Sequence, residues 1–330
     1  MIAPFSNAGI IITYQCNSTC RHCLYNCSPS YSDWASPEWL DSLFARLKAT
    51  TPRMRGYNLA GGEAFLNFPL LLEAVRSAVN HGIPIDYVET NAGWFRDETD
   101  AVSRLMLLKE AGLDCLLVSA SPFHAEHIPI YRTIGLVHAS IKVFGSAGTI
   151  VWLPEFLRKL SIKFDQAKTV SLEEYLEKTG AASHDYTWQY GGALIAGGRA
   201  SDTLEDRLPQ KPLDELYQST CRMELYLSGG GHIDLYGNVI PACCSGISLG
   251  SADNLESVYQ GETLSERPLV RLLAETGVRG LVELAVDECG FQPKQTYSSK
   301  CALCCKARKS LTPLAQAFPE LAPACFYAAA

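Results

Sequence analysis

Short apolar runs alternate with amphipathic segments along roughly the first 200 residues of this 330-residue chain. Six apolar runs, bounded by polar or glycine-containing stretches, have the character of strands and lie at residues 9–13, 57–60, 85–89, 114–119, 149–153 and 186–196. Helical spacing between these runs predicts helices near residues 36–47, 68–81, 99–111 and 129–144, and further helices to about residue 178. Six strand–helix units in alternation favour an α/β fold with a parallel sheet, which we expect to be a partial (β/α)6 barrel.

The pattern changes after residue 200. Ser201 to Pro212 is polar and contains proline, which predicts a linker. Beyond it, Glu224 to Leu227 is predicted to be a short strand, and His232 to Ala242 a strand pair hinged at Gly237-Asn238. We therefore expect two domains, a barrel at residues 1–200 and a small α+β domain at residues 201–330.

Composition and charge narrow the classes of function. With 47% hydrophobic residues the chain has ample material for a buried core. Its net charge of -7 argues against nucleic-acid binding, which needs basic surfaces to neutralise phosphates. No apolar run approaches the ~20 residues of a membrane helix, and the N-terminus lacks the character of a signal peptide. We expect a cytoplasmic protein with no membrane or nucleic-acid partner.

Thirteen cysteines in a chain of this kind indicate metal or redox sites rather than disulfides. Cys16, Cys20 and Cys23 follow the first apolar run at C-x3-C-x2-C spacing. Three thiolates on one loop can hold three irons of a [4Fe-4S] cluster and leave the fourth iron without a protein ligand. A zinc site closed by His22 or Cys27 is the alternative.

This spacing, together with Gly61-Gly62-Glu63 after the second predicted strand, resembles the radical S-adenosylmethionine (radical SAM) family. The resemblance implies that SAM chelates the open iron at the C-terminal ends of the strands. One electron then cleaves SAM to a 5′-deoxyadenosyl radical, which abstracts hydrogen from a substrate. It also implies a one-electron reductant such as flavodoxin or ferredoxin. Glu63 would bind the methionyl ammonium, and the glycines would let the backbone approach SAM.

Four further residues are expected to contact SAM on the same grounds. Thr90 and Asn91 end the third predicted strand and Ser119 ends the fourth, where the family places contacts to the ribose or the methionyl carboxylate. Arg199 is expected beside SAM on the sixth strand. Ordinary loop polarity is the alternative explanation for these side chains.

A second set of cysteines lies in the C-terminal part of the chain. Cys221, Cys243, Cys301 and Cys304 have a pattern similar to the twitch domain, the short form of the SPASM extension of radical SAM enzymes. The resemblance implies a second, auxiliary [4Fe-4S] cluster. A zinc ribbon with the same four thiolates is the alternative.

The adjacent pairs Cys243-Cys244 and Cys304-Cys305 leave the choice of ligand open by one position each. Neighbouring residues on a strand point to opposite faces, so one cysteine of a pair can bind metal while the other faces elsewhere. We expect Cys243 to be the ligand. Cys244 is then a candidate catalytic thiol that returns a hydrogen atom to a substrate radical, as in peptide epimerases of this family.

The favoured function is an epimerisation-type modification of a peptide. Besides the Cys243-Cys244 pair, the segment Cys20 to Pro29 looks like the cysteine loop of some peptide epimerases. The alternatives are dehydrogenation or rearrangement of a small metabolite, transfer of the aminocarboxypropyl group of SAM, and a non-catalytic zinc or iron-sulfur binding module.

Overall fold

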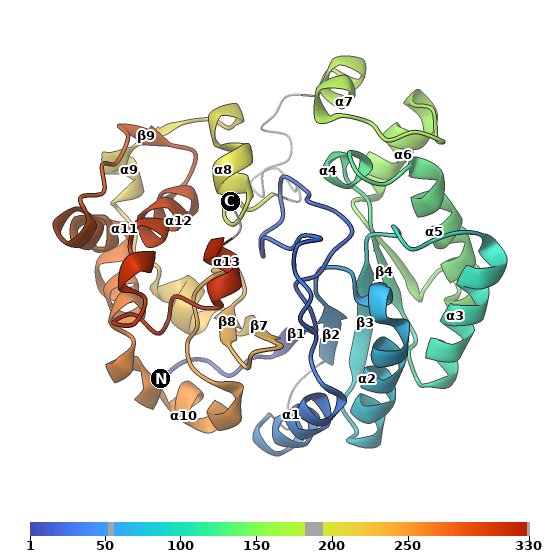
Figure 1. The fold of residues 1–330 in the computed structure, drawn as a ribbon, viewed down its shortest axis with the longest axis horizontal. Coiled ribbons are helices and arrows are strands. Elements are labelled where there is room, and N and C mark those ends of the chain that lie inside the picture. Colours follow the sequence, from blue (N-terminus) through green and yellow to red (C-terminus); the bar gives the residue numbers. More distant parts are fainter. Residues whose placement is uncertain (52–55, 182–193, 329–330) are drawn as a thin grey trace. The chain divides into compact units, whose positions relative to one another are not determined.

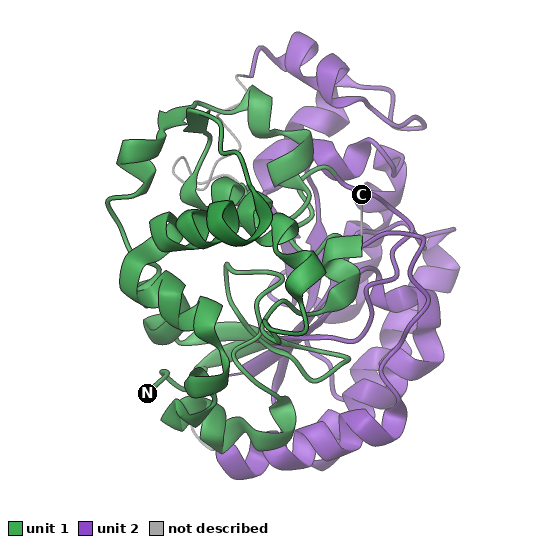
Figure 2. Ribbon diagram, turned by 60° about the vertical axis from the view of Figure 1, so that its left-hand side comes forward, with its two compact units in different colours: residues 1–8, 21–26, 186–330 green, residues 9–20, 27–185 purple. Residues whose placement is uncertain are grey.

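The computed structural model describes residues 1–51, 56–181 and 194–328. The chain divides into two compact units, which Figure 2 colours separately: unit 1 comprises residues 1–8, 21–26 and 186–330, and unit 2 comprises residues 9–20 and 27–185. The sequence predicted a division after residue 200. Two short N-terminal segments and the described residues 194–200 group with the C-terminal part of the chain, and the domain boundary at residue 200 stays a prediction.

Unit 2 is built on parallel strands that follow one another in the order β5-β4-β3-β2-β1. These strands are β1 (Asn7–Ile11), β2 (Gly56–Ala60), β3 (Ile85–Thr90), β4 (Leu116–Ser119) and β5 (Thr149–Trp152). The pairs β2–β3, β3–β4 and β4–β5 are all parallel. Because parallel strands need crossovers, a helix follows each of them.

The principal crossover helices of unit 2 begin where the sequence predicts them. They are α1 (Pro37–Thr50), α2 (Phe68–Asn80), α3 (Glu98–Glu110) and α5 (Ile130–Phe144). Ser36 caps α1 by accepting a hydrogen bond from the Trp39 N–H, and the helix buries the apolar face that ends at Leu47. Figure 1 shows α2, α3 and α5 along one side of the strands. Shorter helices follow, namely η1 (Ala64–Asn67), α4 (Pro122–Ala125), α6 (Pro154–Lys163) and α7 (Leu172–Thr179).

The predicted α/β class, with parallel strands and helical crossovers as in a partial barrel, is confirmed. Five strand–helix units lie in the described residues. The sixth predicted strand, at residues 186–196, falls almost wholly outside them. Successive parallel strands bring their C-terminal ends to one edge, where the residues after β1, β2 and β3 meet.

Unit 1 contains a hairpin and a set of helices. The hairpin joins β7 (Gly230–Asp234) to β8 (Val239–Pro241), with Gly237 in its turn at a φ of 81° that suits glycine. The predicted strand pair at His232 to Ala242 is therefore confirmed. The helices are α8 (Ala200–Thr203), α9 (Leu213–Leu216), α10 (Leu255–Gln260), α11 (Pro268–Cys289), α12 (Lys300–Ser310) and α13 (Ala324–Ala328). Nowhere in the described ranges is a helix both long and apolar enough to span a membrane.

Two predictions for unit 1 are wrong. Residues 224–227 belong to a π-helical turn, Met223–Leu227, because a short apolar run fits a helix as well as a strand. The predicted linker at 201–212 is ordered and contains α8, a 3-10 turn and β6 (Lys211–Pro212), which pairs with β9 (Thr296–Tyr297). Its polar residues make internal contacts: the buried Glu205 carboxylate accepts a hydrogen bond from the Ser298 N–H at 2.7 Å.

Candidate functional site

Gly61 and Gly62 join the end of β2 to the backbone that leads into the first cysteine. The Gly62 N–H donates to the Thr13 carbonyl at 2.9 Å. A Cβ on Gly62 would lie 1.9 Å from the Gln15 carbonyl oxygen, and one on Gly61 would lie 2.6 Å from the Thr13 oxygen. Neither position has room for a side chain. The two glycines let the backbone after β2 pack closely against the backbone of Thr13 and Gln15. That they also let the backbone approach SAM stays a prediction.

Glu63 ties the end of β2 to the end of β3. Its side chain is only 1% exposed and accepts hydrogen bonds from the Asn91 N–H at 2.7 Å and the Phe65 N–H at 3.1 Å. The Thr90 hydroxyl lies 2.9 and 3.0 Å from its two oxygens. Burial raises the pKa of Glu63 to about 7, although these hydrogen bonds act in the opposite direction. The carboxylate is thus held rigidly at the edge where the strands end.

Asn91 connects this carboxylate to the first cysteine. While its backbone N–H donates to Glu63, its side-chain amide donates to the Cys16 Sγ at 3.4 Å and to the Asn17 Oδ1 at 2.8 Å. Cys16 is buried. An N–H aimed at a sulfur stabilises negative charge on it, which is what a metal-binding thiolate requires. The two motifs found in the sequence are therefore physically joined through Asn91.

The other residues predicted at strand ends differ in their surroundings. The Thr90 hydroxyl, buried beside Glu63, also accepts from the Trp94 indole N–H at 2.9 Å. The Trp94 ring stacks on Phe65 with centroids 4.3 Å apart. Ser119 ends β4 opposite Trp152 and is half-buried. Thr90 therefore supports Glu63, and direct contacts of Thr90, Asn91 and Ser119 with SAM stay predictions.

The segment around Cys23 is held by residues of unit 1. The Arg199 N–H donates to the Cys23 carbonyl at 3.0 Å, so Arg199 positions the loop through its backbone. A Cβ on Gly198, whose φ is 55°, would lie 2.3 Å from the Leu24 carbonyl oxygen. Cys16 and Cys20 belong to unit 2 and Cys23 to unit 1. That the three thiolates share one cluster, and that Arg199 contacts SAM, stay predictions.

Six cysteines of unit 1 line one small cavity of about 30 Å³, namely Cys221, Cys243, Cys244, Cys301, Cys304 and Cys305. Leu225 and Leu273 contribute apolar surface, and Arg308 is one of two basic residues in the lining. Across the described parts of the chain, no three His, Cys, Asp or Glu side chains are grouped so that they could hold a single metal ion. In a four-iron cluster each thiolate binds a different iron. A cavity ringed by thiols fits that donor set.

A break in α11 places Cys221 at this cavity. Gly277 has φ 69° and ψ -157°, which interrupts the helix. A Cβ there would lie 2.4 Å from the Ser219 carbonyl oxygen, so only glycine lets the chain before Cys221 pass this close. The Leu273 carbonyl accepts from the Cys221 N–H at 2.9 Å instead of completing a helical turn. The break in the helix thus fixes the backbone of the first thiol.

Cys244, rather than Cys243, lies among the other three predicted thiols. The pKa of Cys244 is raised well above its ordinary value, first by burial and then by the proximity of Cys301, Cys221 and Cys304. Cys243 is exposed, and burial followed by the Glu224 carboxylate raises its pKa. The surroundings of Cys244 suit a metal ligand, but both cysteines line the cavity, so the choice of Cys243 made from the sequence stays a prediction. Strand alternation does not apply to this pair, because β8 ends at Pro241 and both cysteines follow it.

Cys301 and Cys304 lie one turn apart at the start of α12, which Ser299 caps by accepting from the Ala302 N–H. Burial raises the pKa of Cys301, and the neighbouring Cys304 and Cys305 raise it further. Buried thiols of this kind lose their protons when a metal binds, so metal binding would convert them into thiolates.

Arg308 is the residue of this cavity that the sequence analysis missed. It lies one helical turn after Cys304, and its guanidinium donates to the Cys305 Sγ at 3.2 Å and to the Ser245 carbonyl at 2.9 Å. It also donates to the Tyr327 hydroxyl at 2.6 Å. The signal was present as an i, i+4 spacing from Cys304, but many surface arginines share such a spacing.

No family model matches the chain. No curated protein matches it either. Among solved structures, it is similar to BtrN in complex with AdoMet and 2-DOIA, with 15% identity, a TM-score of 0.48, and coverage of 84% of this chain and 91% of that chain. It is similar to native anSMEcpe with bound AdoMet, at 12% identity and a TM-score of 0.47, covering 96% and 98% of the two chains.

The chain is also similar to SuiB of Streptococcus suis bound to the precursor peptide SuiA, with 14% identity and a TM-score of 0.37. That match covers 78% of this chain and 65% of SuiB. The first two of these structures contain bound AdoMet, and the third contains a bound precursor peptide.

Proposed function

We propose that this protein is a radical SAM enzyme that abstracts a hydrogen atom from a substrate carbon. The observation that carries the proposal is the link from Glu63 through Asn91 to Cys16. A carboxylate for the methionyl ammonium and a thiolate for the cluster are the two parts that SAM cleavage must hold in fixed relation. A single side chain bonded to both provides that relation.

In this proposal Cys16, Cys20 and Cys23 hold a [4Fe-4S] cluster with one open iron. The burial of Cys16 and Cys20 and the amide aimed at the Cys16 sulfur suit such a cluster. When bound, the cluster supplies the electron that splits SAM into methionine and a 5′-deoxyadenosyl radical. The protein's own part is positional: Glu63 is held by Thr90 and the Asn91 N–H, so it meets the ammonium without reorganising.

For the auxiliary cluster we propose Cys221, Cys244, Cys301 and Cys304 as ligands, since these thiols surround the cavity and influence one another's ionisation. Replacing Cys244 with alanine should lower bound iron after anaerobic reconstitution from about eight to about four per chain. Replacement of the adjacent Cys243 with alanine is the matched control and should leave about eight irons bound per chain. Iron and sulfide analysis measures both. A loss of iron in the Cys243 variant alone would restore the assignment made from the sequence.

The substrate that we favour is a peptide, with epimerisation at a carbon as the outcome. If Cys244 is a ligand, the exposed Cys243 is the thiol left to donate hydrogen. SAM takes one electron and the deoxyadenosyl radical removes the substrate hydrogen, giving methionine, 5′-deoxyadenosine and a carbon radical. The Cys243 S–H returns hydrogen to the opposite face and becomes a thiyl radical. One further electron from the reductant, with a proton from water, restores the thiol.

Deuterium incorporation tests this outcome. With dithionite, SAM and a short precursor peptide found by sequencing the neighbouring genes, the protein in D2O should incorporate one deuterium into the peptide at the altered carbon, because the Cys243 thiol exchanges with solvent. Mass spectrometry measures the incorporation, and the Cys243→Ala variant should still form 5′-deoxyadenosine but no deuterated product. A product that has lost two hydrogens would instead indicate dehydrogenation. Stoichiometric zinc without SAM cleavage would refute the enzyme altogether.

A further inference from the structure

A buried cation stands beside the proposed auxiliary site. Arg308 is only 2% exposed, and its Nε is buried without a hydrogen-bond partner. In the part of the chain that the structure describes, no carboxylate forms an ion pair with it. Its partners are formally neutral, namely the Ser245 carbonyl, the Tyr327 hydroxyl and the side chains of Cys304 and Cys305. A fully buried charge without a counter-charge costs several kcal/mol.

The aromatic residues of α13 enclose this charge without neutralising it. The Phe326 and Tyr327 rings each lie 5.7 Å from the guanidinium carbon, in cation–π range. The Tyr327 hydroxyl in turn donates to the Gly246 carbonyl. A Cβ on Gly246 would lie 2.4 Å from the Phe326 ring, so glycine at this position lets the C-terminal segment close over Arg308. The rings of Phe326 and Tyr327 thus cover one side of the guanidinium, while Arg308 also lines the cysteine cavity.

We infer that Arg308 is the counter-charge of the auxiliary cluster and holds its reduction potential high, an inference that rests on the proposed ligand set. Four thiolates give a [4Fe-4S] site a net negative charge, and reduction makes it more negative. A fixed positive charge in a dry environment stabilises the reduced state most. Arg308 also hydrogen-bonds the side chain of Cys304, a proposed ligand, and hydrogen bonds to the ligand sulfurs raise the potential. Arg308 would therefore make this cluster an electron acceptor.

The test isolates the auxiliary cluster in a chain whose Cys16, Cys20 and Cys23 are all replaced by alanine. In this background, a redox titration followed by electron paramagnetic resonance gives the potential of the remaining cluster. Arg308→Gln should lower its electron affinity by about tenfold or more, which is a fall of about 59 mV for a one-electron couple. An unchanged potential with full iron content would overturn the inference.

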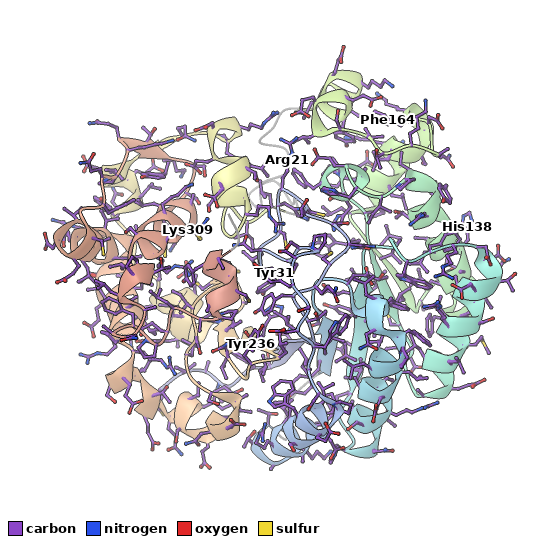
Figure 3. All side chains as sticks on the ribbon, in the orientation of Figure 1. Arg21, Tyr31, His138, Phe164, Tyr236 and Lys309 are labelled. Carbon is purple, nitrogen blue, oxygen red and sulfur yellow. The ribbon has the colours of Figure 1, made fainter. Side chains whose placement is uncertain are left out.

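Lys309 provides the matched control. It is the next residue of α12 (Figure 3), but it is partly exposed and pairs with Asp202. Lys309→Gln removes the same formal charge from a solvated position, so the potential should change far less. A shift equal to that of Arg308→Gln would show a general charge effect and would also overturn the inference.

Further variants separate the inference from a structural role and from the proposed function. If Arg308→Gln does not hold a cluster, Arg308→Met decides: its unbranched apolar side chain fills similar space without the charge, and electron affinity should fall by about tenfold. An unchanged potential in Arg308→Met would then overturn the inference. Absence of any cluster in the parent with Arg308 intact would refute the auxiliary site of the proposed function instead.

Discussion

Replacing Cys16 with alanine is expected to abolish 5′-deoxyadenosine formation and to lower bound iron from about eight to about four per chain. Cys16 is the thiol to which Asn91 donates, and the backbone before it is packed against the two glycines that follow β2. Loss of this ligand removes the N-terminal cluster while leaving the cysteines of unit 1 untouched. Chromatography of the nucleoside products and iron analysis after anaerobic reconstitution measure the two effects.

Cys115→Ala is the control for this variant. Cys115 precedes β4 in the same unit, and burial raises the pKa of its thiol, but neither cysteine motif includes it. Its replacement should leave iron content and SAM cleavage close to those of the parent. Retention of both in the Cys16 variant, or their loss in the Cys115 variant, would contradict the assignment of the N-terminal cluster.

The strand–helix alternation of unit 2 was predictable because its periodicity is strong and its helices carry local start signals. Ser36 before Pro37 is such a signal, and it caps α1 as expected. Unit 1 was less predictable. Residues 224–227 are too short a run to separate strand from helix, and the order of residues 201–212 depends on the pairing of β6 with the distant β9. No local pattern encodes that pairing.

The candidate site shows a similar division. Spacing indicated Cys16, Cys20, Cys23 and the glycines after β2 as candidates because these motifs are local, whereas the second cysteine set is spread from Cys221 to Cys304. Whether Cys243 or Cys244 is the ligand depends on which side chain lies nearer to Cys221 and α12. Packing determines this, and no local sequence pattern encodes it. The sequence predicted that Gly61 and Gly62 let the backbone approach SAM. The structure gives a second reason for glycine at residue 62, because the Gln15 carbonyl leaves no room for a side chain there.

Because the Gln15 backbone leaves no room for a side chain at residue 62, Gly62→Ala is expected to destabilise the protein strongly. The new Cβ would lie 1.9 Å from the Gln15 oxygen and 2.9 Å from the Cys16 nitrogen, and these backbone atoms cannot rotate away. We expect a loss of about 3 kcal/mol in the free energy of unfolding or more, since overpacking against fixed atoms forces the chain to shift. Urea denaturation followed by circular dichroism measures it.

The matched control is Gly180→Ala. Gly180 ends α7 with a φ of 65°, and a Cβ there would meet no atom within 4 Å. Only the left-handed conformation opposes a side chain at this position, at a cost of about 1 kcal/mol. Equal denaturation midpoints for the two variants would mean that the backbone at residues 13–16 gives way easily. In that case Gly61 and Gly62 would be required for a ligand rather than for the contact between β2 and the cysteine loop.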